Sequence, residues 1–198
     1  MNLAELVTEV YAYTSRPDLV AKTLSAVKAA TLKMHHSDYY GRDLIEQEIN
    51  FASALNYHTY DYTVGFPQFR ALKYLRYLDK TVTPNVKGDF FQIIEPEQIV
   101  DGYNVTRENI VYLSGAALII KALTEFRYGW ISYYKHPVIT DGGYTSWIAV
   151  EHPYAIVYEA ARTICKFVGK LDSAASLEKS LNEELALLKI TAVQLRGY

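Results

Sequence analysis

The sequence EHPYAIVYEAARTICKFVGKLD, residues 151–172, has helical periodicity over most of its length. Its apolar residues recur every three or four positions, which predicts an amphipathic helix. Gly169 suits the position just after that helix, because glycine adopts the left-handed conformation at no steric cost. The short connection GKLD, with Asp172 as the expected N-cap of a second helix, predicts an αα-hairpin. The expected inward stripe of the first helix is Tyr154, Val157, Tyr158, Ala161, Ile164, Cys165 and Val168.

Further helices are predicted on both sides of this hairpin in the sequence. The second hairpin helix carries a leucine stripe, and residues 3–13 repeat an amphipathic pattern. In the segment SRPD, Ser15 is the expected N-cap of another helix, and Asp18 completes a capping-box pattern. Residues 1–45 and 146–190 are therefore predicted to form a helical bundle. The leucine stripe consists of Leu177, Leu181, Leu185 and Leu188.

The periodicity changes in the middle of the chain. FRALKYLRYL alternates as an amphipathic strand does, and DFFQII, NIVYLSGAALII and EFRYGWISYYKHP are rich in β-branched and aromatic residues. TVTPNVKGD predicts a turn, and Pro96 in EPEQIV opens a short helical turn. These patterns predict a small antiparallel β-sheet at about 66–136, inserted between the helical segments. The predicted fold class is α+β, in a single domain of residues 1–198.

Composition limits the classes of partner. The chain has 22 acidic and 20 basic side chains, a net charge of −2, and so lacks the basic surplus with which proteins grip nucleic-acid phosphates. The single cysteine, Cys165, excludes an internal disulfide framework. The N-terminal run carries Glu5 and Glu9, unlike a signal peptide, and the apolar run 110–120 is too short to span a bilayer. We expect a soluble intracellular protein without a membrane partner.

Tyrosine is unusually frequent, at 18 of 198 residues. A tyrosine side chain combines a large apolar ring with a polar tip, which suits half-buried positions. The abundance of tyrosine is therefore compatible with large subunit interfaces and with a sheet that has many half-exposed positions.

Catalytic motifs are not recognisable in the sequence. The five histidines lack the spacing of a zinc site, and there is no nucleophile elbow, phosphate-binding glycine loop or dinucleotide fingerprint. We therefore predict no catalytic residue, no metal and no cofactor. A small metal-assisted α+β enzyme using His35, His58 or His152 remains the rival from another functional class.

The C-terminal stretch NEELALLKITAVQLRGY, residues 182–198, has no stop signal before Gly197. Its last eight residues, Thr191–Tyr198, alternate polar, apolar, basic and aromatic side chains. We predict that they form an extended arm that docks on a partner and becomes ordered on binding. The alternative is a frayed helix end, since chain termini are often poorly ordered.

Three segments together resemble a head–tail adaptor (connector) protein of tailed bacteriophages. They are LVTEVYAYTSRPDLVAKTLSAVKAATLKMHHSDYYGRDLIE, FPQFRALKYLRYLDK and SWIAVEHPYAIVYEAARTICKFVGKLDSAASLEKSLNEELALLKI. The similarity covers nearly the whole chain and lies in the order and spacing of the segments. The C-terminal pattern of two helices also resembles the tail-tube adaptors of podoviruses.

The resemblance implies a structural, non-enzymatic virion protein. Such adaptors form a ring, commonly of twelve copies, below the portal protein, and extend the channel through which double-stranded DNA passes without specific binding. They attach the tail or nozzle proteins, so the implied location is the neck of the virion, and the host cytoplasm during assembly. The residues implied to dock on the portal are Leu185, Leu188, Ile190, Val193, Leu195, Arg196 and Tyr198.

Composition agrees with this implication, but alternatives remain. A near-neutral charge suits a channel in which DNA must slide without sticking. Another neck or tail component, such as a head-completion or tail-terminator ring, would have the same composition. A third possibility is a monomeric protein that binds a bacterial host target.

Overall fold

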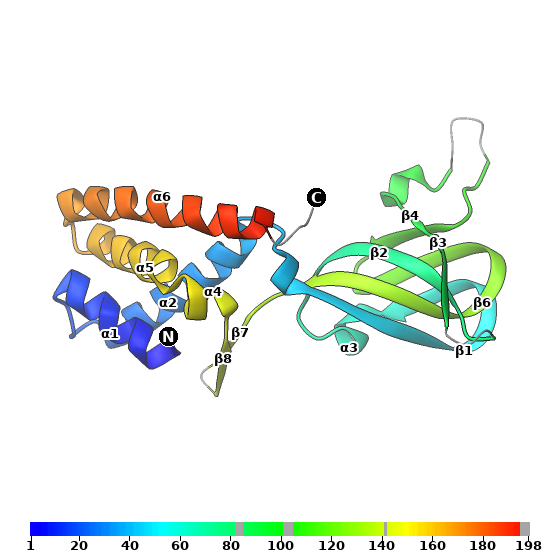
Figure 1. The fold of residues 1–198 in the computed structure, drawn as a ribbon, viewed down its shortest axis with the longest axis horizontal. Coiled ribbons are helices and arrows are strands. Elements are labelled where there is room, and N and C mark those ends of the chain that lie inside the picture. The colour runs from blue at the N-terminus through cyan, green and yellow to red at the C-terminus, as the bar shows by residue number, and fades with distance from the viewer. Residues whose placement is uncertain (82–84, 101–104, 141, 195–198) are drawn as a thin grey trace. The chain divides into compact units, whose positions relative to one another are not determined.

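The chain forms two compact units (Figure 1). A computed structural model describes residues 1–81, 85–100, 105–140 and 142–194. The helical unit comprises Met1–Asp43 and His136–Tyr198, and the β unit comprises Leu44–Lys135. The β unit is thus one continuous segment inserted into a unit that is built from both ends of the chain.

The helical unit is organised around one central helix, α5 (Pro153–Phe167). This helix packs against each of the other four helices of the unit. Its apolar stripe is as predicted, since Val157 and Ile164 are buried in the core. Gly169 follows with φ 78°, which confirms its predicted role at the C-terminal end of the helix. The remaining elements are α1 (Leu3–Thr14), α2 (Val20–His36), η1 (Gly41–Asp43), the hairpin β7 (Val138–Thr140) and β8 (Gly143–Thr145), α4 (Trp147–Glu151) and α6 (Leu171–Gln194).

The predicted extended C-terminal arm is wrong for the residues that the structure describes. Helix α6 continues to Gln194, through the first four positions of the predicted arm at 191–198. Residues 195–198 lie outside the described part of the chain. The physical reason is that a helix, once begun, propagates at low cost through good helix formers, and neither glycine nor proline interrupts residues 182–194.

Two predicted helix caps are also wrong. Ser15 ends α1, at φ 53°, and α2 begins only at Val20. The guanidinium of Arg16 donates two hydrogen bonds to the Asp18 carboxylate, which therefore binds a side chain and does not cap the helix. At the other hairpin Asp172 is the second residue of α6, two positions after the N-cap position.

The β unit contains one six-stranded sheet, whereas the sequence predicts a small antiparallel one at about 66–136. The sheet begins at Leu44, and it is mixed because β4 and β5 pair in parallel. Its hydrogen-bonded order is β3-β2-β6-β5-β4, and β1 also pairs with β6. The strands are β1 (Leu44–Asp61), β2 (Phe69–Asp79), β3 (Val86–Phe90), β4 (Gln92–Ile93), β5 (Ile110–Ser114) and β6 (Ala117–Lys135), with the short helices α3 (Tyr62–Gly65) and η2 (Pro96–Gln98) between them.

Strand β1 is the longest element that the sequence did not predict. Its sequence, LIEQEINFASALNYHTYD, alternates only in its first half, and its central residues are exposed. The pairing with β6 shifts register on both sides of Leu55, which breaks the two-residue period. Because β6 lies more than fifty positions further along the chain, the hydrogen bonds that define β1 leave no local signal.

The sheet closes on itself through Phe91. This residue alone separates β3 from β4, and its amide donates to the Leu75 carbonyl oxygen at 2.9 Å. The next amide, of Gln92, donates to the Asn109 carbonyl oxygen at 2.7 Å. The segment 86–93 therefore bonds to β2 with its first part and pairs with β5 through its second part, which joins the two ends of the sheet order. Among the described strands β1 pairs with β6 alone, so this connection does not remove every edge of the sheet.

The core of the β unit is aromatic. Phe51, Phe66, Phe91 and Phe126 are buried together with aliphatic side chains of β5 and β6. The ring of His58 stacks on that of Phe51, with centroids 3.9 Å apart, and its Nε2–H donates to the Phe126 carbonyl oxygen at 2.9 Å. Histidine 58 is thus a packed core residue. In the described ranges, each helix is too short or too polar to cross a bilayer.

Candidate interaction surfaces and a buried histidine network

A buried network of hydrogen bonds lies in the helical unit, at the end of α2. The Nδ1 atom of His35 is 3.0 Å from each carboxylate oxygen of Asp43, and its Nε2 atom is 2.9 Å from Ser146 Oγ. A carboxylate oxygen accepts, so His35 Nδ1 donates to Asp43, and Nε2 forms its hydrogen bond with the Ser146 hydroxyl. The indole N–H of Trp147 donates to the same carboxylate at 2.9 Å.

The chain Asp43–His35–Ser146 has the same order of residue types as the catalytic triad that activates serine in hydrolases. Here the burial of all three residues and the second bond of Ser146 favour a structural role. At least nine-tenths of the surface of His35, Asp43 and Ser146 is buried. The Ser146 oxygen also caps α4, because it accepts from the Ala149 amide at 3.2 Å. The network therefore ties the ends of α2 and η1 to the start of α4. Neither Asp43 nor Ser146 was a candidate from the sequence, since they lie 8 and 111 positions from His35.

The other two histidines considered for an enzyme lie in different surroundings. His58 is held in the aromatic core of the β unit. His152 lies half-buried at the junction of α4 and α5, next to Pro153. Within the part of the chain that the structure describes, no three histidine, cysteine or acidic side chains are grouped to hold a metal ion.

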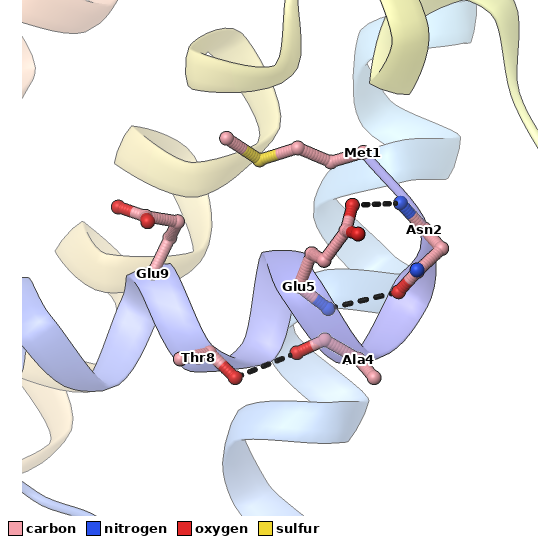
Figure 2. A pocket seen from close by; sticks show the side chains of 6 residues that line it. All are labelled: Met1, Asn2, Ala4, Glu5, Thr8 and Glu9. Atoms are coloured by element: carbon pink, nitrogen blue, oxygen red, sulfur yellow. Dashed lines mark hydrogen bonds between the residues drawn. The ribbon is translucent and has the colours of Figure 1, made fainter.

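One surface hollow of the described residues lies along the start of α1 (Figure 2). Its volume is about 350 Å³, and its polar groups already bond one another. The Asn2 amide donates to a Glu5 carboxylate oxygen, and the Glu5 amide donates to Asn2 Oδ1, each at 2.9 Å. This reciprocal capping box stabilises the first turn of the helix. The lining residues are Met1, Asn2, Ala4, Glu5, Thr8 and Glu9.

A second hollow lies in the β unit, beside β4. Its volume is about 240 Å³, and its walls are mostly apolar. Ile93 and Leu113 on its rim are partly exposed. The lining residues are Arg70, Ala71, Leu72, Ile93, Ile94, Glu95, Pro96, Tyr112 and Leu113.

The predicted portal-docking residues do not share one environment. Leu188 is fully buried in the helical core, and Leu185 is half-buried against it. Ile190 is 55% exposed. Val193 lies in the last turn of α6, where only the backbone is described, and Leu195, Arg196 and Tyr198 lie outside the described residues. Leu187, which the sequence analysis did not single out, is 52% exposed on the same helix.

A second candidate surface is the outer face of the sheet in the β unit. On this face, Trp130 of β6 pairs with Arg76 of β2 and with Glu48 of β1. Arg76 is also paired with Phe90 of the edge strand β3. We call this surface the aromatic–charged face, and it consists of Glu46, Glu48, Tyr74, Arg76, Lys80, Lys87, Phe90, Tyr128 and Trp130.

Cations cover the rings of this face. Lys87 Nζ lies 4.0 Å from the ring centroid of Trp130, and the Arg76 guanidinium carbon lies 4.3 Å from that of Phe90. Lys80 Nζ lies 4.4 Å from the Tyr128 ring. Such cation–π contacts place aromatic rings and positively charged side chains on one surface. Aromatic residues and arginine are enriched at protein interfaces.

Glu46 organises the centre of the aromatic–charged face. It accepts hydrogen bonds from the Tyr74 hydroxyl and from the Trp130 indole N–H. The Tyr74 hydroxyl is the main reason why the pKa of Glu46 lies below its ordinary value, although desolvation opposes this effect. The predicted alternation of FRALKYLRYL is confirmed in this half of β2, where Arg76 is half-exposed and Leu75 is buried. It is broken earlier, where the pairing of β2 with β6 shifts register.

No protein-family model matches this chain, and a comparison with curated proteins found no match.

Proposed function

We propose that this chain is a structural virion protein, a head–tail adaptor that assembles as a ring below the portal. In this role it extends the DNA channel, attaches tail or nozzle proteins and resides in the neck of the virion. The proposal begins from the resemblance of three long segments to such adaptors. It requires two independent binding surfaces, one for the portal and one for a neighbouring copy or the tail.

The observation that carries the proposal is that α6 continues beyond the helical core. Among the side chains that the structure describes, Leu188 is the last of α6 in that core, and the helix continues to Gln194. Ile190, just after the core, is exposed although it is aliphatic. An apolar helical end of this kind binds by burying surface, with a gain of roughly 25 cal/mol per Å². We therefore assign portal docking to Ile190 and the residues that follow it, and leave Leu188 to the core.

The aromatic–charged face provides the second surface. It carries acidic and basic side chains in one plane, together with large rings, and so suits contact with another protein. The chain has a net charge of −2, which suits passage of double-stranded DNA without tight phosphate contacts. We assign this face to a neighbouring copy in the ring or to a tail protein.

The proposal is tested by mixing the purified full-length chain with portal rings of the same virus. We expect a ring of chains on each portal ring, visible by negative-stain microscopy and countable by native mass spectrometry. Binding to tail-tube ends and not to the portal would overturn the adaptor assignment in favour of a tail-terminator ring. Binding to neither would overturn both.

The docking assignment is tested separately. Deletion of residues 191–198 and the substitution Ile190→Ser are expected to weaken portal binding at least tenfold, because each removes apolar surface from the helix end. Val150→Ser is the matched control, since Val150 is 70% exposed and lies on another helix, α4. Portal binding that survives both changes would remove the docking role of α6 but not the adaptor function.

A further inference from the structure

Two histidines from distant parts of the sequence face each other on the helical unit. His36 is the last residue of α2, and His136 is the first residue of the segment that returns from the β unit. The Nε2 atom of His36 lies 3.1 Å from the Nδ1 atom of His136. Their ring centroids are 5.0 Å apart, with the ring planes tilted by 54°. His36 is exposed and His136 is half-exposed, so ions in solution can reach the pair.

The two nitrogens share one proton. Each neutral imidazole has one nitrogen that donates and one that accepts, so one ring donates to the other across this 3.1 Å contact. When each neutral ring instead carries its proton on its other nitrogen, two in-plane lone pairs face the same space. A cation that accepts both lone pairs would replace the proton.

The spacing fits a transition-metal ion. Zinc binds histidine nitrogens at about 2.0–2.1 Å, and two such nitrogens at a tetrahedral angle are about 3.3 Å apart. The separation in this pair is 3.1 Å, which differs by a few tenths of an ångström. Imidazole is a preferred ligand for zinc, copper and nickel, whereas calcium and magnesium prefer oxygen.

We propose that His36 and His136 form a two-histidine site for a divalent transition-metal ion of the zinc, nickel and copper group. Among the described residues no third histidine, cysteine or acidic side chain is grouped with the pair, so water would complete the coordination of a bound ion. The site is therefore open, and it links the C-terminal end of α2 to the start of the returning segment. It is independent of portal binding.

His35 and His58 do not offer this geometry. Both ring nitrogens of His35 already have partners, in Asp43 and Ser146. In His58, Nε2 donates to a backbone carbonyl oxygen inside the aromatic core. His35 and His36 are adjacent on α2, yet they contact different elements. The proposed site therefore combines His36 with His136, which lies 100 positions further along the chain.

Titration calorimetry of the full-length chain with zinc chloride and, separately, with nickel chloride tests the proposal. We expect one ion per chain at neutral pH, with release of protons and loss of binding on acidification, because the ion competes with protons for the imidazoles. His36→Ala and His136→Ala are each expected to weaken binding about 100-fold, because one ligand remains and the chelate is lost. His152→Ala keeps the histidine count of these variants and should bind as the parent does.

A second measurement guards against variants that fold poorly. Zinc should raise the melting temperature of the parent and of His152→Ala, and leave that of His36→Ala and His136→Ala unchanged. Absence of binding to the parent, or equal binding by all three variants, would overturn the proposal. Portal binding by His36→Ala is expected to be normal, so failure of this site is distinguishable from failure of the adaptor function.

Discussion

The two units of the chain are filled by different side chains. Six of the seven phenylalanines lie in the β unit, and only Phe167 lies in the helical unit. The helical core instead contains many alanines, among them Ala155, Ala160 and Ala161 on α5. Small side chains let helices approach closely, whereas a closed sheet encloses a volume that large rings fill. The comparison shows that one chain can build two separate cores of different chemistry, each of which can be disrupted alone.

The largest effect is expected from a charge in the helical core. Val157→Asp places a carboxylate at a fully buried position of α5, and the unpaired charge costs several kcal/mol. We expect the helical unit to unfold while the β unit keeps its structure, because the two cores are separate clusters. Amide NMR spectra would show this as dispersed signals from residues 44–135 alone.

Val150→Asp provides the control for this prediction. Val150 lies on α4 and is 70% exposed, so the same substitution should change stability by less than about 0.5 kcal/mol. Equal melting of Val157→Asp and the parent would show that the assigned inward face of α5 is wrong.

The converse effect is expected from Phe91→Ala. Phe91 joins β3 to β4 and is buried among the aromatic rings of the β unit. Its truncation should cost about 3–5 kcal/mol and loosen the closure of the sheet, leaving the helical unit folded. Urea denaturation followed by tryptophan fluorescence would report both units, since Trp130 lies in one and Trp147 in the other.

Phe90→Ala is the matched control for the closure of the sheet. Phe90 is the preceding residue, on the opposite face, and is 57% exposed. We expect it to cost less than about 1 kcal/mol, mainly through its contact with Arg76. If the two alanine variants were equally stable, Phe91 would not close the sheet.

The smallest effect is expected from ionisation of Tyr158 on α5. A hydrogen bond with Tyr13 is the main reason why the pKa of Tyr158 rises to about 12, and desolvation adds to it. Because this folded value lies above the ordinary value of 10, the fold holds the proton more tightly than the unfolded chain does. The resulting stability is complete below pH 10 and is lost as pH rises towards about 12.

The measurement is a series of denaturation curves between pH 9 and pH 12, on the parent and on Tyr158→Phe. The variant should lose stability less steeply over this range, and at pH 7 it should differ from the parent by about 1 kcal/mol or less. Identical slopes for the two proteins would contradict the raised pKa.

Much of the helical unit was predictable because helix signals are local. The periodicity of residues 153–167, the role of Gly169 and the leucine stripe of α6 all depend on neighbours within a few positions, and the structure confirms them. The caps at Ser15 and Asp172 were mispredicted because short polar side chains fit several roles at a chain reversal. The arm at 191–194 was mispredicted because no residue there stops the helix.

The candidate sites were less predictable. Docking by Ile190 and its neighbours on α6 was proposed because the resemblance to head–tail adaptors implies it. Only the structure shows that Leu188 is buried in the core and therefore cannot dock on a partner. The sequence shows that Leu188 is apolar, but not whether it faces the core or a partner. The aromatic–charged face draws on β1, β2, β3 and β6, and no sequence window contains it.

The amino-acid sequence by itself predicted an α+β chain with helices at both ends, because the backbone hydrogen bonds of a helix join residues only four positions apart. Three features arise only when distant segments meet: the pairing of β1 with β6, the closure of the sheet at Phe91, and the contact of His36 with His136. Each depends on partners that are brought together by the packing of the whole chain, and a partner 100 positions away leaves no periodic trace in the sequence.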